Sequence, residues 1–479
     1  MMTTSVRAGL VSFRHGLTYA TLALAAPLLM TVPAAGQTSS AQSGSPQSAK
    51  VQQPRPMVLK RSPSGDVFHY TFQRGDTLFQ LADTYMTRPD GWRSVLRMNR
   101  IANPRSIPAG TVIALPLSLL KADNLTARTV AFRGSGTITP PNGTTMPLAV
   151  NLPISPGMVV TSGPGSFITL QLSNGSRITL PSHSRLRITQ MRRIHLGDTL
   201  DFDFMLEKGR LETEVTPLKS PNNRYRIRTP IAVSAVRGTI YRVAYDGPDA
   251  PSLTEVIEGS VAVSPGLTDN SEQVDKGFGA SLTGNGQFSK QALLPPPELL
   301  QPGRVQTDPE VRLTLAPVTG ATRYHAQLSR DAGFVDIEHD IYADTPELHL
   351  SNIDNGRWFT RLTAISPEGM EGMPINYSMR RVLAGLNASA EQGDDGGYRF
   401  RWSGDGDGQR FYHFNLRPDT PGAVPLIDET GLTGQLISIS DLPAGTYIWR
   451  VGVQQFENGE YVVNWLPEQK LIVASEDRP

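Results

Sequence analysis

The sequence predicts a multidomain protein in which a small α+β module, ordered strand, helix, helix, strand, precedes predominantly all-β domains. Three observations support this fold class. Helical periodicity is confined to residues 78–98, and strand-like segments flank it. From Thr129 onward, short alternating runs are broken by Gly, Asn and Pro. Two segments nearer the C-terminus repeat each other at an offset of 412 − 324 = 88 residues.

Composition narrows the classes of function. The chain has 479 residues, a formal net charge of +1 and no cysteine. Its length indicates roughly three or four domains. The balanced charge indicates neither a nucleic-acid binder nor a polybasic membrane protein. The absence of cysteine excludes disulfides, thiol nucleophiles and cysteine-ligated metals.

The N-terminus has the layout of a secretory signal. Arg7 and Arg14 precede an apolar run at 17–32, and small residues follow at 34–36. We therefore expect residues 1–36 to be a cleaved signal peptide, which would place the protein in the periplasm or cell envelope of a bacterium. An uncleaved membrane anchor is the alternative, although the run is shorter than the ~20 residues of a spanning helix. No later segment is apolar enough to span a membrane.

Residues 37–64 are rich in Gln, Ser and Pro and have no apolar period. Such a segment cannot bury enough surface to offset the entropy of ordering. We expect a disordered tether.

Residues 65–120 predict the α+β module. Its apolar residues recur at spacings of three and four in the first helix, as one buried helical face requires. Asp76 or Thr77 can cap that helix. The expected elements are a strand at 67–72, a helix from 78, a break at 89–91, a helix from 92 to 98 and a strand at 111–115.

This module resembles a lysin motif (LysM) domain over its full length. The matching residues are Tyr70, Gly75, Asp76, Thr77, Leu78, Leu81, Ala82, Tyr85, Asn99, Ile101, Asn103, Pro104, Ile107, Gly110, Leu115 and Pro116. The stretch 86–92 departs from the family, whose link between the helices is simpler.

The resemblance implies a ligand and a site. LysM modules bind N-acetylglucosamine polymers, chiefly peptidoglycan, in a shallow groove between the first strand-to-helix loop and the loop before the second strand. By position, the resemblance assigns the two walls of this groove to Gly75, Asp76, Thr77 and Leu78, and to Arg100, Ile101, Asn103 and Ile107.

The residue types agree with such a site. Backbone groups at a Gly-containing turn can bond an N-acetyl group, while an apolar side chain covers its methyl. The alternative for Asp76 and Thr77 is helix capping alone, and both roles are compatible.

Residues 121–290 predict a β-rich domain. Asn174-Gly175 between two alternating runs is a strong hairpin signal. Short, regularly interrupted strands indicate a sandwich, a barrel or a single-stranded stack. The region resembles the FecR domain, a periplasmic β-rich module, through residues 172–176, 206–211, 227–230, 235–239 and 256–261.

In the best-known FecR members this domain relays iron-siderophore transport to a sigma factor. Those proteins carry a cytoplasmic anti-sigma segment before a membrane helix, whereas only residues 1–16 precede the apolar run here. We do not expect the signalling role to transfer.

Charged side chains in this domain allow two interpretations. Arg237 could bind a carboxylate or phosphate, although pairing with a neighbouring Glu such as Glu258 is favoured. Asp198, Asp201 and Asp203 could suggest a metal cluster or acid pair. Alternation puts Asp201 and Asp203 on one face, which we expect to be the solvated one.

Residues 291–306 are Pro-rich and predict a stiff spacer. Beyond them, Tyr324 aligns with Tyr412, and Asn355 aligns with Ala444 at 444 − 355 = 89 residues. A period near 90 suits one β-sandwich of about 100 residues.

We therefore expect two sandwiches, at 307–384 and 385–475, which resemble fibronectin type III-like domains. Tyr324 and Tyr412 should fill equivalent core positions. Trp358 and Trp449 could form a sugar-stacking platform, but core packing is favoured because each lies in an alternating strand.

No catalytic residues, metal ligands or cofactor site are predicted. The eight histidines are scattered, and neither His-Glu-x-x-His nor Gly-x-Ser-x-Gly occurs. The favoured function is a non-enzymatic envelope scaffold that binds peptidoglycan and presents its β domains to another, unidentified envelope protein. A periplasmic component of a FecR-type signalling system is the alternative, and an unrecognised cell-wall hydrolase is a third.

Overall fold

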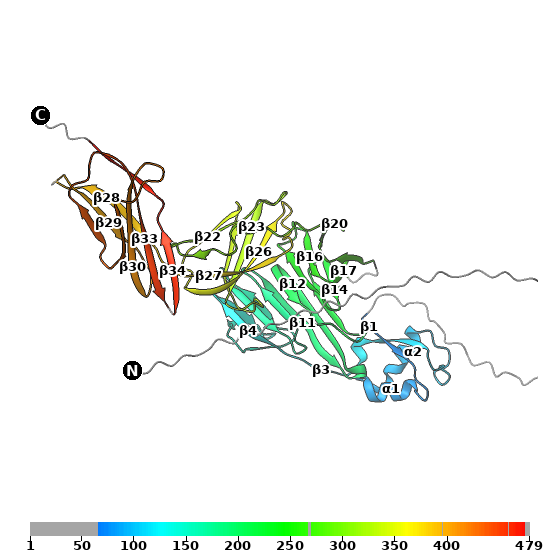
Figure 1. Cartoon of the computed structure of the whole chain (residues 1–479). Helices are drawn as coiled ribbons and strands as arrows, with labels where there is room; N and C mark the ends of the chain where they lie inside the picture. The colour runs from blue at the N-terminus through cyan, green and yellow to red at the C-terminus, as the bar shows by residue number, and fades with distance from the viewer. Residues whose placement is uncertain (1–65, 267–269, 395, 458, 475–479) are drawn as a thin grey trace, which may run out of the picture. The chain divides into compact units, whose positions relative to one another are not determined.

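A computed structural model describes residues 66–266, 270–394, 396–457 and 459–474 (Figure 1). The expected signal peptide and tether lie outside the described residues. Two short α-helices occur near residue 80, and nearly all other elements are strands. The predicted fold class, an α+β module followed by all-β domains, is confirmed. None of the described helices has the length and apolar character needed to cross a membrane.

The N-terminal module has the predicted order of elements. These are β1 (Val67–Thr71), α1 (Leu78–Tyr85), the 3-10 helix η1 (Pro89–Gly91), α2 (Trp92–Met98) and β2 (Val112–Pro116). β1 and β2 are antiparallel, with His69 opposite Ala114. α1 begins where it does because the Thr77 hydroxyl accepts a hydrogen bond from the Gln80 amide at 3.1 Å.

The next domain completes the core of this module. A 3-10 turn, η2 (Leu117–Leu119), follows β2, and a second one, η3 (Leu196–Asp198), returns to it from the β-rich domain. Ile194 and Leu196 are buried in the same apolar cluster as Phe68, Leu78 and Leu115. The module and the β-rich domain therefore share one hydrophobic core rather than touching only at a linker.

The β-rich domain extends from β3 to β20, which form one closed set of hydrogen-bonded neighbours. Its strands are β3 (Ala122–Asn124), β4 (Ala127–Arg133), β5 (Gly136–Thr139), β6 (Met146–Pro147), β7 (Pro153–Ile154), β8 (Val159–Ser162), β9 (Phe167–Gln171), β10 (Arg177–Leu180), β11 (Arg185–Ile194), β12 (Thr199–Glu214), β13 (Arg224–Arg228), β14 (Ala232–Val236), β15 (Ile240–Tyr245), β16 (Ser252–Glu258), β17 (Ser260–Pro265), β18 (Glu272–Asp275), β19 (Phe278–Leu282) and β20 (Phe288–Ala292). The pairing β9–β10 is antiparallel and forms the hairpin predicted at Asn174-Gly175.

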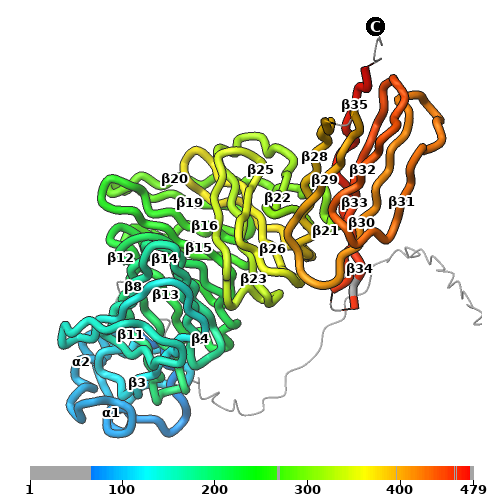
Figure 2. Tube along the Cα trace, turned by 90° about the vertical axis from the view of Figure 1, so that its left-hand side faces the viewer, coloured from blue at the N-terminus to red at the C-terminus, as the bar shows by residue number. Residues whose placement is uncertain are grey.

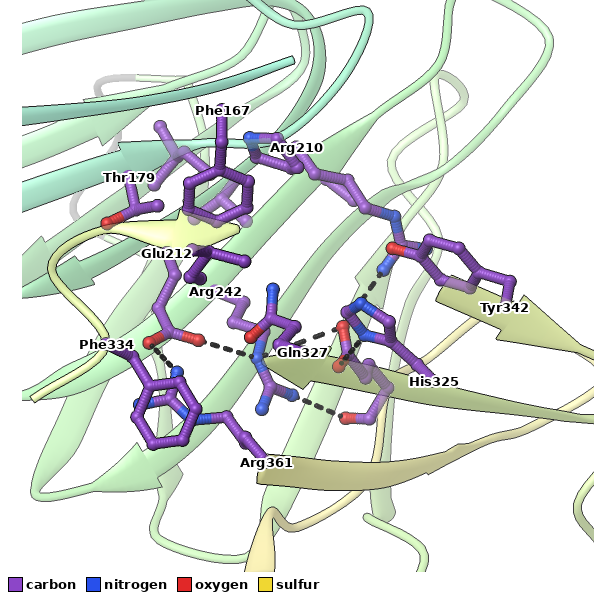
Figure 3. Close-up of a pocket in the computed structure, with 16 residues that line it drawn as sticks. Phe167, Thr179, Arg210, Glu212, Arg242, His325, Gln327, Phe334, Tyr342 and Arg361 are labelled. Atoms are coloured by element: carbon purple, nitrogen blue, oxygen red, sulfur yellow. Dashed lines mark hydrogen bonds and ion pairs between the residues drawn. The ribbon is translucent and has the colours of Figure 1, made fainter. Parts of the chain in front are cut away.

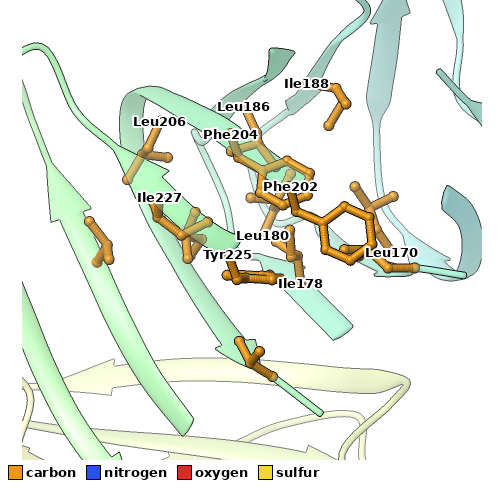
Figure 4. Close-up of a cluster of buried hydrophobic side chains, with 14 of the residues drawn as sticks. Leu170, Ile178, Leu180, Leu186, Ile188, Phe202, Phe204, Leu206, Tyr225 and Ile227 are labelled. Carbon is orange, nitrogen blue, oxygen red and sulfur yellow. The ribbon is translucent and has the colours of Figure 1, made fainter. Parts of the chain in front are cut away.

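The long strand β12 joins the two halves of this domain. Its first part pairs with β11 and, in parallel, with β13, whereas its second part pairs with β10 and β15. The change occurs at Gly209, whose φ of +86° suits glycine. A Cβ there would lie 2.6 Å from the Ser184 Cα. Phe202, Phe204 and Tyr225 fill the core between the halves (Figure 4).

Two β-sandwiches follow (Figure 2). The first contains β21 (Val305–Gln306), β22 (Val311–Thr314), β23 (Arg323–Ser329), β24 (Ile337–Ala343), β25 (Glu347–Leu350), β26 (Gly356–Ile365) and β27 (Ile375–Arg381). The second contains β28 (Asn387–Gln392), β29 (Tyr398–Ser403), β30 (Gln409–Pro418), β31 (Ile427–Leu432), β32 (Leu436–Ile439), β33 (Gly445–Glu457), β34 (Glu460–Trp465) and β35 (Gln469–Val473).

The predicted repeat corresponds to equivalent strands. The order β24-β23-β26-β27 in the first sandwich recurs as β31-β30-β33-β34 in the second. Tyr324 and Tyr412 are buried at matching places, as predicted. Trp358 and Trp449 are also buried, which confirms core packing over an exposed sugar platform.

Residues 291–306 are held by contacts to both neighbouring domains. Leu293 is buried with Ala244 of the β-rich domain and Met370 of the first sandwich, and Leu299 forms an isolated bridge with Leu315 of that sandwich. The segment that we expected to act as a spacer therefore has fixed packing at these points.

One expectation about charge in the β-rich domain is wrong. Asp201 and Asp203 are 0% and 1% exposed instead of lying on a solvated face. Arg192 contacts Asp201 at 2.9 Å, Arg226 contacts Asp203 at 2.9 Å, and Arg228 also contacts Asp203. Alternation placed both carboxylates on one face correctly, but arginines on β11 and β13 cover that face.

The favoured ion pair of Arg237 is also not found. In the described ranges Arg237 makes no ion pair with Glu258, and its guanidinium donates to the Pro221 carbonyl at 2.9 Å. Arg237 itself is exposed.

Candidate functional site

The two loops expected to form the glycan groove leave the small sheet at the same end. β1 and β2 are antiparallel, so the end of β1 lies beside the start of β2. The Phe72 amide donates to the Thr111 carbonyl at 2.9 Å, and the Gly110 amide donates to the Phe72 carbonyl at 2.7 Å. These bonds fix the bases of both loops against each other.

The first loop is organised by Asp76. Its carboxylate accepts hydrogen bonds from the Tyr70 hydroxyl at 2.7 Å and from the Gln73 amide at 2.6 Å. Burial raises the pKa of Tyr70, and the hydrogen bond to Asp76 raises it further. Thr77 caps α1. The capping alternative is therefore found for Thr77 alone, whereas Asp76 holds the loop through Tyr70 and Gln73 rather than capping the helix.

Gly75 and Leu78 occupy opposite environments in this loop. Gly75 is exposed, has a φ of +92°, and leaves nothing within 4 Å of a Cβ position. Leu78 is 0% exposed and belongs to the core. Its side chain therefore supports the wall from behind rather than facing a ligand.

The second loop contains both exposed and buried members of the predicted wall. Arg100 and Asn103 are exposed, Ile107 is half-buried, and Ile101 is only 8% exposed. The Asn103 side-chain oxygen accepts from the Arg105 amide at 3.0 Å and thereby shapes the turn. The exposed polar residues thus form the part of this wall that a ligand could touch.

Asn99 has a role that the sequence did not reveal. Its buried amide nitrogen donates to the Val95 and Ala114 carbonyls at 2.8 and 2.7 Å, and its oxygen accepts from the Ala114 amide at 2.7 Å. It therefore ties the end of α2 to β2 and positions the loop that begins at Arg100. Its place at the helix end and its match to the LysM family marked the position, but neither signal indicated these hydrogen bonds.

An aromatic pair beside the first loop was also missed. Phe79 is 49% exposed, and its ring centroid lies 4.6 Å from that of Trp92. Phe79 lies off the apolar helical face, so periodicity gave no reason to select it. The pair adds an apolar surface next to Leu78.

A second cluster of functional side-chain types lies between the β-rich domain and the first sandwich (Figure 3). It surrounds a cavity of about 40 Å³. Arg242 contacts Glu212 at 3.2 Å, Glu255 at 3.5 Å and Glu371 at 3.9 Å. Arg361 contacts Glu212 at 2.9 Å. A cavity of this size accommodates no more than a few waters.

His325 is fixed inside this cluster as an imidazolium. Its Nδ1 lies 2.7 Å from Glu371 and its Nε2 lies 2.6 Å from Asp340. Burial alone would lower the pKa of His325, but Glu371 and Asp340 outweigh it and raise the pKa to about 9. Because both ring nitrogens donate to carboxylates, neither is left to act as a general base.

The pKa of Glu371 is held well below its usual value because, against the effect of burial, Arg242 and His325 favour the carboxylate. The cluster therefore consists of matched ionised groups that join two domains. In the ranges that the structure covers, no three His, Asp or Glu side chains are grouped to hold a metal ion.

Comparison with known families gives two matches. Residues 70–116 match the LysM domain, and residues 158–262 match the family described as FecR protein. Curated proteins gave no match to the chain.

Solved structures give distant similarities. A putative anti-sigma factor from Parabacteroides distasonis is 17% identical, with a TM-score of 0.24, and the alignment covers 28% of this chain and 59% of that one. A two-domain fibronectin type III segment of chicken tenascin is 17% identical, with a TM-score of 0.17, over 36% of this chain and 99% of that one. The FN1-FN3 domains of chicken CNTN1 are 10% identical, with a TM-score of 0.19, and the alignment covers 60% of this chain and 97% of that one. Similarities this low carry no argument about function.

The two family matches fall within the segments whose residues resemble these families. LysM and FecR modules are binding or signalling modules that suggest a cell-envelope protein. Residues 70–116 are thus a LysM domain and residues 158–262 a FecR domain, and two β-sandwiches follow them in the chain.

Proposed function

We propose that this protein is a non-enzymatic scaffold of the cell envelope that is exported, binds peptidoglycan through its LysM domain and presents its β domains to another envelope protein. The observation that carries the proposal is the pair of LysM loops held at one end of the β1–β2 sheet. The glycan would lie between Gly75, Asp76, Thr77 and Leu78 on one side and Arg100, Ile101, Asn103 and Ile107 on the other.

A fixed connection between the wall-binding module and the rest of the chain supports the scaffold role. The Arg224 guanidinium donates to Asp66 at 3.0 Å, and the Asn222 amide donates to the His69 carbonyl at 3.1 Å. With the shared core at Leu196, these contacts would hold the β domains in a defined position relative to the wall.

Retention on purified wall sacculi tests the proposal. The double variant Arg100→Ala, Asn103→Ala changes two exposed side chains and should lose most of its retention; because Asn103 also shapes the turn through the Arg105 amide, a circular-dichroism melt checks that the variant is folded. The variant Asn124→Ala, Arg128→Ala makes the same chemical changes at exposed positions of β3 and β4 and is the matched control. Equal retention of both variants would exclude the assigned groove.

A second function, relay of a signal across the envelope, is favoured by the FecR domain at 158–262. It predicts that deleting the protein alters expression of a gene set controlled by a sigma factor. An unchanged transcript profile would leave the scaffold role as the better account. Release of soluble wall fragments by the purified protein would instead support a hydrolase.

A further inference from the structure

A groove of about 710 Å³ lies on the outer face of the FecR domain, beside β1 of the LysM domain. Its volume falls in the range of about 300 to 1,000 Å³ that is usual for ligand sites. The floor consists of short side chains of β14 and β17, among them Ala235, Ala262 and Ser264. Because these side chains are short, the space above the two strands stays open.

Positive charge predominates in the groove. Three arginines, Arg224, Arg226 and Arg237, line it with Asp66 as the only carboxylate among the described lining residues. Arg224 and Arg226 contact Asp66 at 3.0 and 2.5 Å. Asp66 cannot neutralise all three, so the lining presents a cationic surface.

The layer of charge beneath the floor does not remove this excess. Arg226 reaches inward to Asp203 at 2.9 Å, but Asp203 also contacts Arg228, and Asp201 contacts both Arg192 at 2.9 Å and Arg226 at 3.7 Å. This group therefore contains five arginines and three aspartates, namely Arg192, Arg224, Arg226, Arg228 and Arg237 with Asp66, Asp201 and Asp203.

Arg237 is the side chain placed to meet a ligand. The β13–β14 register puts Tyr225 opposite Val236, so the next residues, Arg224 and Arg237, are neighbours at one end of the pair. Like charges so placed destabilise a sheet. Burial, and then the charge of Arg226, lower the pKa of Arg224, as expected where cations are crowded.

Two glycines beside Arg237, Gly238 and Gly259, line this end of the groove. Gly238 has a φ of +140°, and a Cβ there would lie 2.9 Å from the Pro217 Cα. A Cβ on Gly259 would lie 2.8 Å from the Gly238 carbonyl oxygen. Side chains are excluded at both positions, while the hydrogen bond to Pro221 fixes the Arg237 guanidinium at the rim.

We propose that this groove binds the carboxylates of the short peptides attached to the wall glycan, so that the FecR domain reads the peptide while the LysM domain holds the sugar. The inference rests on the proposed function. Guanidinium groups pair with carboxylates through two parallel hydrogen bonds, and Arg237 retains donors for this. His69 lines the groove, and the first loop of the proposed glycan site begins three residues later, at Phe72. Three residues of strand span about 10 Å, within reach of one glycan-peptide unit.

The chain's own N-terminal segment is a poorer occupant. Residues 37–65 lead directly to Asp66 at the groove, but they contain Lys50, Arg55, Lys60 and Arg61 and neither Asp nor Glu. A basic segment would be repelled by the cationic lining. The charge therefore favours an acidic ligand from outside the chain.

Calorimetric titration of the full chain tests the inference with four probes: a chitin oligomer, a soluble wall fragment of glycan with peptide, the free peptide, and that peptide with its carboxyl groups amidated. The variants are Arg237→Gln and Ala262→Glu, which places a carboxylate on the floor. Arg312→Gln makes the same charge change at a solvent-exposed position of β22 and is the control.

We expect Arg237→Gln to weaken binding of the free peptide and of the fragment by about ten-fold, as for loss of one charge-assisted contact. Ala262→Glu should weaken both further, and amidation should mimic these losses. Binding of the chitin oligomer should be unchanged, which also shows that the variants are folded.

Three results would overturn the inference. The first is no binding of the free peptide to the parent protein, and the second is equal affinities of Arg237→Gln and Arg312→Gln for that peptide. The third, from further titrations, is binding of acetate or inorganic phosphate as tight as that of the peptide, because the groove would then be a general anion site. If the peptide binds through Arg237 but the chitin oligomer does not bind, the groove is retained and the proposed glycan site fails.

Discussion

His325 is the residue whose charge connects the FecR domain with the first sandwich. Its imidazolium lies between Glu371 and Asp340, with Arg210 and Arg242 on the far side of Glu371 and with Tyr342 stacked on its ring at 4.1 Å. Its pKa of about 9 lies above the value of the free side chain. Protonation is therefore favoured by folding.

The stabilisation that comes from His325 should depend on pH. It is fully present below pH 6.5 and is lost as pH rises to about 9, because the folded state then releases its extra proton. The free energy of unfolding should fall by about 3 kcal/mol over this pH range. Urea unfolding between pH 6 and pH 9.5 measures it. His325→Gln should be less stable at pH 6 and should show a flatter pH profile; an unchanged profile would exclude His325 as the source.

Arg242 contacts three carboxylates at once, of which Glu255 and Glu371 are buried and Glu212 is half-buried. Arg242→Met should therefore destabilise the domain contact by roughly 3 to 5 kcal/mol, since Glu255 and Glu371 would remain buried without this cation. A lower denaturation midpoint, followed by Trp358 fluorescence, checks this. Arg312→Met, an exposed arginine, should shift the midpoint little, and equal shifts would contradict the argument.

At the scale of elements, β12 explains why the β-rich domain is one unit. Gly209 lies where the strand leaves β11 and β13 and joins β10 and β15. A glycine at this point lets one strand bend from the first set of partners to the second, so both sets belong to one unit.

Two glycine substitutions separate backbone strain from crowding. Gly277 has a φ of +81° and nothing within 4 Å of a Cβ position. Gly277→Ala should therefore lower the free energy of unfolding only by the strain of alanine in the left-handed region, about 1 to 2 kcal/mol. Gly209→Ala adds a clash with Ser184 and should cost about 1 to 3 kcal/mol more. Differential scanning calorimetry of both variants tests the difference; equal melting temperatures would show that β12 can shift away from Ser184.

Some elements were predictable and others were not, for physical reasons. Spacings of three and four identify the buried face of α1, and Asn-Gly identifies the β9–β10 turn, because both signals are local. The burial of Asp201 and Asp203 depends on arginines that reach them from other strands. Alternation reports which residues share a face and cannot report what covers it.

At the scale of the molecule, the repeat near 90 residues identified two sandwiches because their cores use aromatic residues at matching positions. The glycan loops followed from the LysM resemblance, but their exposure did not: Leu78 and Ile101 are buried, whereas Phe79 is exposed. The charge cluster around His325 could not be predicted from the sequence, since its members come from β12, β15, β16, β23, β24, β26 and the loop after β26.

The shared core makes a prediction about domain independence. Leu196→Ala removes an apolar side chain that the FecR domain contributes to the LysM core. We therefore expect the free energy of unfolding to fall by about 2 to 5 kcal/mol. Limited proteolysis should then release the LysM segment sooner than in the parent protein. Leu300→Ala, at an exposed position, is the control. Identical cleavage rates would mean that the LysM core is self-sufficient.

This shared core also bears on the order in which the chain can fold during its synthesis. The chain emerges from its N-terminus, so the LysM segment is complete well before Ile194 and Leu196 appear. Until then, the apolar cluster around Phe68 and Leu115 lacks the side chains of Ile194 and Leu196 that complete it. The LysM module would therefore reach its final packing only after part of the next domain has been synthesised, so the last step of its folding waits for a segment nearly 80 residues farther along the chain.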